Sequence, residues 1–79
     1  MPLIYEYVGI YIYLRYREHN PPHIHIEQPG YKGTMNIKDG KHSKGMPNKV
    51  RKVAENFIKK HKEELLKMWD AKQAYKIED

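Results

Sequence analysis

Three histidines and two glutamates fall within the ten residues EHNPPHIHIE, at positions 18–27. His23 and His25 are separated by one residue, so on a β-strand both imidazoles project from the same face. Such a pair can hold a divalent transition metal ion such as Zn²⁺, with His19 from the turn or Glu27 as a third ligand. The alternative is that these imidazoles bond only to backbone and tyrosine groups.

The same histidines also suit RNA cleavage without a metal ion. That reaction needs a base for the 2′-hydroxyl, an acid for the leaving 5′-oxygen, and cations beside the phosphate. Histidine serves both proton transfers because it titrates near neutral pH. We expect His23 and His25 to be the catalytic pair and Glu27 to orient one of them. The side chains expected to bind RNA are the cations Arg15, Arg17 and Lys38 and the rings of Tyr11, Tyr13 and Tyr31.

The first of the elements expected to position these residues is indicated by residue types that alternate with a period of two. From Ile4 to Arg17, aliphatic residues alternate with tyrosine and arginine, which predicts one strand with a bend or bulge at Gly9. Residues 23–28 and 31–38 predict two further strands, giving a three-stranded antiparallel meander. Its aliphatic face should hold Ile4, Val8, Ile10, Ile12, Leu14, Tyr16, Ile24, Ile26, Met35 and Ile37. Its other face should hold Tyr5, Tyr7, Tyr11, Tyr13, Arg15, Arg17, His23, His25, Glu27, Thr34, Asn36 and Lys38.

A C-terminal helix is expected to cover the aliphatic face. After Pro47, apolar residues recur at three- and four-residue steps to about Tyr75, which predicts one long helix, or a helix pair broken near residues 60–62. The fold class is then α+β with the order β-β-β-α in a single domain. Its sheet spans residues 1–38, its loop 39–46 and its helical part 47–76. Because the helix can bury only one face, the histidines, arginines and tyrosines should share the open face.

Size and composition narrow the class of protein. The chain has 79 residues, no cysteine and a net charge of +5, so one small domain without disulfides or Cys-based zinc sites is expected. Residues 41–79 carry all the excess charge, with eleven basic against six acidic side chains. Such a region suits a polyanion or an acidic partner, or is simply a solvated helix surface. With no signal peptide and no apolar stretch of roughly 18 residues, a cytoplasmic protein is expected.

Several function classes find no support. The chain has no phosphate-binding loop, so NTP hydrolysis is not indicated, and no nucleophile elbow, so acyl transfer is not indicated. DNA binding through a helix-turn-helix is not indicated either, because the expected helix is needed for the core.

The motif HNPPHIH, at positions 19–25, resembles the signature of the bacterial domain-of-unknown-function 4160 family. The resemblance extends over nearly the whole chain, through Met1-Pro2, Gly9-Ile10, Gly30-Tyr31, Pro47, His61, Glu64-Leu65 and Trp69. Three positions depart from the family pattern, because Glu18, Ile24 and Phe57 stand where aspartate, phenylalanine and tryptophan are common. The resemblance implies a two-gene toxin–antitoxin module in which this chain is the toxin.

Together these observations favour a toxin-like protein that acts on RNA through its histidine-rich sheet face, as a metal-independent ribonuclease without a cofactor. The alternative is a module without catalytic activity, which binds zinc or another divalent transition metal through His19, His23 and His25, or docks a protein. The expected partners are RNA and a small antitoxin-type protein. A homodimer is left open, and no membrane partner is expected.

Overall fold

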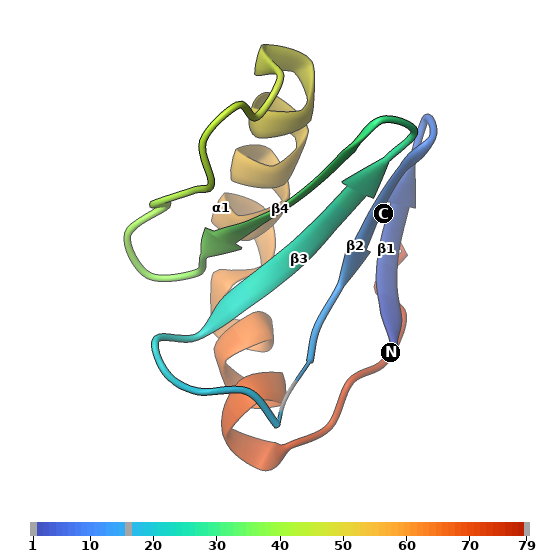
Figure 1. The fold of residues 1–79 in the computed structure, drawn as a ribbon. Coiled ribbons are helices and arrows are strands. Elements are labelled where there is room, and N and C mark those ends of the chain that lie inside the picture. Colours follow the sequence, from blue (N-terminus) through green and yellow to red (C-terminus); the bar gives the residue numbers. More distant parts are fainter. Residues whose placement is uncertain (1, 16, 79) are drawn as a thin grey trace.

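A computed structural model describes residues 2–15 and 17–78 of the chain. Within these residues, a four-stranded antiparallel sheet in the order β1-β2-β3-β4 packs on a single helix, α1 (Figure 1). The elements are β1 (Leu3–Tyr7), β2 (Ile10–Tyr13), β3 (His23–Gln28), β4 (Tyr31–Asn36) and α1 (Asn48–Ala71). The α+β class and the C-terminal helix are therefore confirmed, whereas the sheet has four strands and not three. Tyr16, expected on the aliphatic face, lies outside the described residues.

The expected first strand is in fact a hairpin. Val8 and Gly9 form a two-residue turn, with φ of 47° and 76°, and Tyr7 pairs with Ile10 across it. A turn with two positive φ angles follows the right-handed twist of the flanking strands, so it joins them without splaying. The prediction of one continuous strand was wrong because the alternation of residue types continues through this turn.

The hairpin changes the face on which the first tyrosines lie. Paired residues share a face, and Tyr5 pairs with Ile12 while Tyr7 pairs with Ile10, both of which are buried. The ring of Tyr5 accordingly stacks on Phe57 of α1, with centroids 4.3 Å apart. Both tyrosines therefore lie on the helix side and not on the open face. Val8, expected on the aliphatic face, is 65% exposed in the turn.

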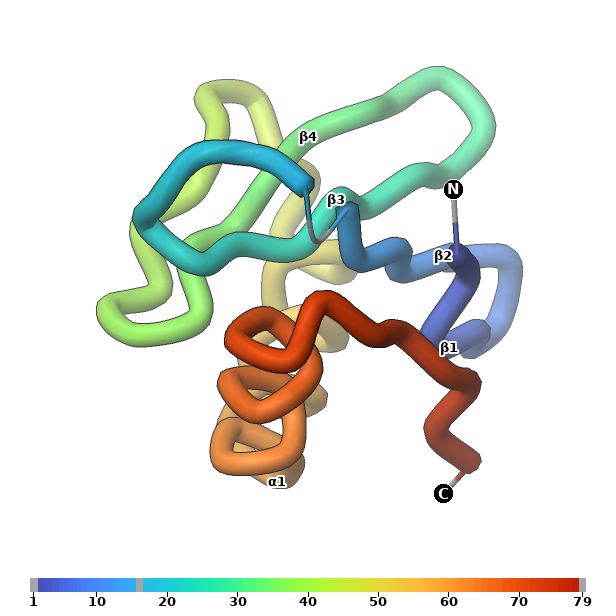
Figure 2. Tube along the Cα trace, turned by 90° about the horizontal axis from the view of Figure 1, so that it is seen from below, coloured from blue at the N-terminus to red at the C-terminus, as the bar shows by residue number. Residues whose placement is uncertain are grey.

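The remaining aliphatic face is buried as predicted. Figure 2 shows the helix lying along one side of the sheet, while no helix of the described chain covers the other side. The buried residues in the strands or directly after them include Ile10, Ile12, Leu14, Ile24, Ile26, Met35 and Ile37. They form one core with the apolar stripe of α1, which consists of Val50, Ala54, Phe57, Ile58, Leu65, Met68 and Trp69.

The helix is kinked within residues 60–62, where a break was one of the two expectations, and it is shorter than expected. Its kink lies at His61, where φ is −124° and ψ is 24°. The helix ends at Ala71 because Lys72 adopts a left-handed conformation, and the following amide of Gln73 donates back to the carbonyl of Met68. The segment beyond, expected to be helical to residue 76, turns back along β1 (Figure 2), where the amide of Ile77 donates to the carbonyl of Ile4.

The last strand also differs from its prediction. β4 ends at Asn36, so Lys38 lies beyond the strand, and its carbonyl accepts a hydrogen bond from Lys62 of the helix. Tyr31 packs against the core on the helix side, over Gly33. Tyr31 is therefore not available to stack on bases at the open face. Across the described residues, no helix has the length and apolar character needed to cross a membrane.

Candidate functional site

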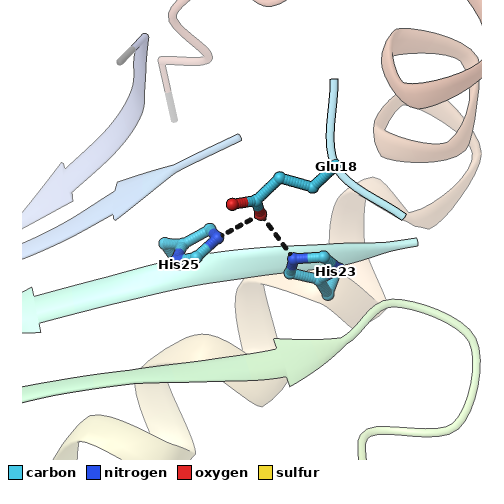
Figure 3. Close-up of side chains that lie close together, drawn as sticks. All are labelled: Glu18, His23 and His25. Atoms are coloured by element: carbon cyan, nitrogen blue, oxygen red, sulfur yellow. Dashed lines mark hydrogen bonds and ion pairs between the residues drawn. The ribbon is translucent and has the colours of Figure 1, made fainter. Parts of the chain in front are cut away.

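Glu18, His23 and His25 form a cluster on the open side of the sheet (Figure 3). One carboxylate oxygen of Glu18, Oε1, lies 2.8 Å from Nε2 of His23 and 2.6 Å from Nε2 of His25. The side chains of His23 and His25 are 16% and 17% exposed, and that of Glu18 is 34% exposed. The cluster is therefore partly buried but open to solvent.

Strand β3 places the two imidazoles side by side. His23 and His25 alternate with Ile24 and Ile26, which are fully buried beneath the sheet. Burial of the isoleucines fixes the register, so the histidines must point to the uncovered face. Their ring centroids are 5.1 Å apart and the ring planes are tilted by 59°. The prediction that both histidines share the open face is confirmed.

The loop between β2 and β3 brings Glu18 to the histidines. The side-chain oxygen of Asn20 accepts a hydrogen bond of 3.1 Å from the indole nitrogen of Trp69 in the last turns of α1. The carbonyl of Pro22 accepts a second bond, of 2.9 Å, from the amide of Ile37. The peptide bond between Asn20 and Pro21 is cis. The loop is thus attached to the helix and to the residue following β4, and both attachments help to position Glu18.

Glu18 is held as a carboxylate. Hydrogen bonding from His25 is the largest effect on its pKa, and bonding from His23 and Arg15 acts in the same direction. Partial burial opposes these effects but is outweighed, so the pKa of Glu18 falls from 4.5 to about 2. Arg15 contributes through an ion pair of 3.4 Å between its Nη1 and the second carboxylate oxygen, Oε2.

The two histidines differ in their hydrogen-bond partners. In His23, Nδ1 lies 2.9 Å from the carbonyl oxygen of Pro21, and Nε2 faces the ionised Glu18. Both partners are acceptors, so each ring nitrogen of His23 faces an oxygen to which an N–H can donate. His25 donates from Nε2 to Glu18, and its Nδ1 makes no hydrogen bond within the described residues. The two imidazoles therefore differ in their partners, because both ring nitrogens of His23 are engaged and only Nε2 of His25 is.

The sheet register surrounds the cluster with polar and aromatic side chains. Tyr13 pairs with His25 on one side, and Thr34 pairs with His25 on the other. One pair further along, Glu27 lies between Tyr11 and Lys32. Tyr11 and Tyr13 are therefore on the open face, as predicted.

Glu27 was expected to orient one of the two histidines, but the glutamate that bonds to them is Glu18. Within the described part of the chain, Glu27 makes no hydrogen bond to either histidine, whereas Glu18 bonds to both. In the sequence, Glu18 is distinguished only by standing where aspartate is common. Its position directly before the HNPPHIH motif was the available sign that it belongs to the cluster. The alternation of residues on a strand cannot show that a loop folds back over β3.

The other predicted residues lie around the cluster or away from it. Arg15 and Arg17 are exposed in the loop that follows β2. His19 is exposed and is not one of the clustered ligands, which are Glu18, His23 and His25. Lys38 lines a hollow on the helix side together with Ile58 and Lys62, so it is not part of this site. The metal set of His19, His23 and His25 is thus corrected by replacing His19 with Glu18.

Comparisons with known proteins identify one family. The family model described as "Domain of unknown function (DUF4160)" matches residues 9–70. The matched segment contains the whole Glu18 cluster and also Asn20 and Trp69, which attach its loop to the helix. No curated protein and no solved structure matches the chain.

Proposed function

The chain belongs to the DUF4160 family, and from its own residues we propose that it acts on RNA at the Glu18–His23–His25 cluster. The further proposal, that it is the toxin-like member of a toxin–antitoxin module, follows from what the resemblance of its HNPPHIH motif implies. The family description states no function, so the proposal depends on the site. The observation that carries it is that two adjacent imidazoles share one carboxylate oxygen of Glu18, with both ring nitrogens of His23 bonded but only Nε2 of His25 bonded among the described residues.

Two adjacent imidazoles suit the two proton transfers of RNA cleavage. The free Nδ1 of His25 takes the proton of a 2′-hydroxyl as that oxygen bonds to the adjacent phosphorus. The bond from phosphorus to the 5′-oxygen breaks, and His23 gives its Nε2 proton to the leaving oxygen. The product is a 2′,3′-cyclic phosphate, and no metal takes part. Glu18 orients His25, the role that was expected of Glu27.

The neighbours of the histidines suit a nucleic acid strand. Tyr13 is the cross-strand partner of His25, and such side chains lie about 5 Å apart. A base stacked on Tyr13 would therefore bring its own sugar and phosphate close to the imidazoles. Arg15 and Arg17, from the following loop, are the cations for the phosphate. An open face, in contrast to a deep pocket, suits a polymeric substrate.

The excess positive charge of the chain lies away from the Glu18–His23–His25 cluster. It belongs to residues 41–79, and α1 packs on the opposite face of the sheet (Figure 2). We propose that these lysines attract RNA over distance and do not contact the scissile phosphate. The exposed lysines of α1 are Lys49, Lys52, Lys59, Lys60, Lys62 and Lys67.

The second candidate function is protein docking at the same face. Tyr11 and Tyr13 are partly buried on a surface that no element of the described chain covers. Tyrosine and arginine are enriched at protein interfaces. A small antitoxin-type protein that covered these rings would also block His25, so docking would then control the activity.

One experiment tests the proposed activity. Wild type, His25→Ala and His42→Ala are expressed without any neighbouring gene, and growth and RNA integrity are measured. His42 is the matched control, because it lies in the loop beyond β4. We expect growth arrest and RNA degradation with wild type and His42→Ala. With purified protein in chelator, cleavage should fall about 100-fold or more in His25→Ala. Intact RNA with wild type, or equal cleavage by His25→Ala, would refute the proposal.

A further inference from the structure

We propose that Glu18, His23 and His25 form a binding site for one divalent transition metal ion of the zinc class. The site does not depend on the proposed action on RNA. Three donor atoms, one from each residue, lie within 4.8 Å of one another. They combine two imidazole nitrogens with one carboxylate oxygen, a ligand set that zinc sites use when a fourth position stays open.

The geometry requires only a small adjustment to accept the ion. Ligands about 2.1 Å from a tetrahedral zinc ion are roughly 3.3 Å from one another. In the metal-free cluster, Oε1 of Glu18 lies 2.8 Å and 2.6 Å from the two Nε2 atoms. To accept the ion, the Glu18 carboxylate must therefore move away from the two imidazoles by roughly half an ångström.

The surroundings of the ligands match those of metal-bound histidines. A histidine that binds metal through Nε2 commonly donates its other N–H to a carbonyl or a carboxylate, which fixes the ring. His23 has this arrangement, because its Nδ1 lies 2.9 Å from the carbonyl oxygen of Pro21. Arg15 contacts Oε2 of Glu18, which leaves Oε1 directed at the histidines. The ion would replace the protons that now join Oε1 to both rings.

The framework of the site is also suited to hold the ligands in place. Two ligands come from the inner strand β3, whose alternate residues are buried in the core. The third is in a loop held to Trp69 through Asn20, and the ring of His23 lies against Trp69, with centroids 5.2 Å apart. Ligands held by packing and outer hydrogen bonds lose little freedom on binding, which favours affinity.

Metal binding and metal-free catalysis would compete for the same nitrogens. A bound ion occupies Nε2 of His23, the atom assigned to protonate the leaving oxygen. Zinc is therefore expected to inhibit the cleavage proposed above. If cleavage instead required zinc, the metal-free mechanism would be wrong while the metal site would stand.

The test measures metal uptake and not activity. Chelator-treated full-length protein is titrated with Zn²⁺ by calorimetry, and bound zinc is measured by elemental analysis. We expect saturation at one zinc per chain at micromolar protein. Loss of a residue that only hydrogen-bonds to a metal ligand weakens metal binding by about 10–100-fold. Glu18 and His25 would be ligands themselves, so Glu18→Gln and His25→Ala should each weaken zinc binding by more than this. His19→Ala, Glu27→Gln and His42→Ala are matched controls that should bind as wild type does.

A second measurement covers variants that fail to fold. Long-range ¹H–¹⁵N spectra of the wild type report each imidazole nitrogen separately. On addition of Zn²⁺, we expect the Nε2 signals of His23 and His25 to shift while Nδ1 of His23 keeps its proton. The proposal is overturned if wild type takes up no saturating zinc, if His42→Ala weakens binding as much as His25→Ala, or if other histidines shift instead.

Discussion

The indole nitrogen of Trp69 donates a hydrogen bond of 3.1 Å to the side-chain oxygen of Asn20, 49 residues earlier in the chain. The same indole ring lies against the imidazole of His23. Trp69 therefore contacts both the loop that carries Glu18 and one of the histidines that Glu18 binds. This contact connects a helix residue far from the motif to the candidate site.

Replacing Trp69 by phenylalanine separates these two contacts. Trp69→Phe keeps an apolar ring in a nearly buried position but removes the N–H donor to Asn20. We expect a loss of about 1–3 kcal/mol in the free energy of unfolding, from the lost hydrogen bond and the smaller ring. Urea unfolding measures this loss, and zinc titration should show affinity reduced by about tenfold as Glu18 becomes less well positioned.

The contribution of the Trp69–Asn20 hydrogen bond to the free energy of unfolding can be isolated with substitutions at Asn20. Asn20→Asp keeps an oxygen acceptor for Trp69, whereas Asn20→Leu does not. In a double-mutant cycle, Asn20→Leu and Trp69→Phe should be less than additive, with a coupling of about 0.5–1.5 kcal/mol. Full additivity would show that the bond contributes nothing to stability.

The low pKa of Glu18 makes stability depend on acid pH. A folded-state pKa of about 2, below the ordinary 4.5, means that ionised Glu18 stabilises the fold above pH 4.5. This contribution is lost as the pH falls through about 2. The difference in unfolding free energy between wild type and Glu18→Gln should therefore shrink on acidification from pH 6 towards pH 2.

Glu27→Gln supplies the comparison for this pH series. Glu27 lies on the same face but bonds to neither histidine. The difference in unfolding free energy between wild type and Glu27→Gln should stay nearly constant between pH 6 and pH 2. An equal slope for both glutamate variants would mean that the acid sensitivity arises outside the cluster.

The period-two pattern predicted the sheet faces wherever a strand is flanked by clear turns. Ile24 and Ile26 were placed in the core, and His23 and His25 opposite them, because burial of the isoleucines permits only one register. The pattern failed at residues 8–9, because a two-residue turn interrupts a strand without breaking the alternation. Residue types alone do not distinguish a long strand from a tight hairpin there.

The same limit explains why the two histidines of the cluster were placed together in advance but Glu18 was not. Strand residues have faces that the sequence determines, so the two histidines could be placed together. Glu18 lies in a loop, whose path depends on contacts with Trp69 and Ile37 that are distant in sequence. No local pattern shows those contacts. The acid nearest on the strand, Glu27, was therefore assigned the role in place of Glu18.

Tyr31 carries a buried hydroxyl with no hydrogen-bond partner in the described structure. Burying such a group without a partner is unfavourable, while the ring itself packs against the core. Tyr31→Phe should therefore keep the stability of wild type or raise it by up to about 1 kcal/mol in urea unfolding. Tyr13→Phe, on the open face, serves as the comparison and should change stability by less than about 0.5 kcal/mol. A marked loss in Tyr31→Phe would reveal a partner such as a buried water.

Salt dependence of RNA binding separates contact from long-range attraction. If Arg17 contacts phosphate, Arg17→Gln should reduce the slope of log affinity against log salt by about 1. The double variant Lys52→Gln and Lys59→Gln, on exposed positions of α1, should slow association at low salt but leave cleavage of bound RNA unchanged. Slower cleavage at saturating RNA in the lysine variant would place RNA on the helix.

The turn at Val8 offers a direct route to greater stability. Val8 has a φ of 47°, a left-handed conformation that costs an L-residue about 1–2 kcal/mol and is least suited to β-branched side chains. Asn-Gly is the preferred pair for a turn of this kind, and Val8 is 65% exposed, so little packing is lost on substitution. Val8→Asn should raise the unfolding free energy by about 1 kcal/mol in urea titrations. Val8→Ile keeps the branched side chain and should give no gain. Equal stability of both variants would show that residues 7–10 do not form this turn in solution.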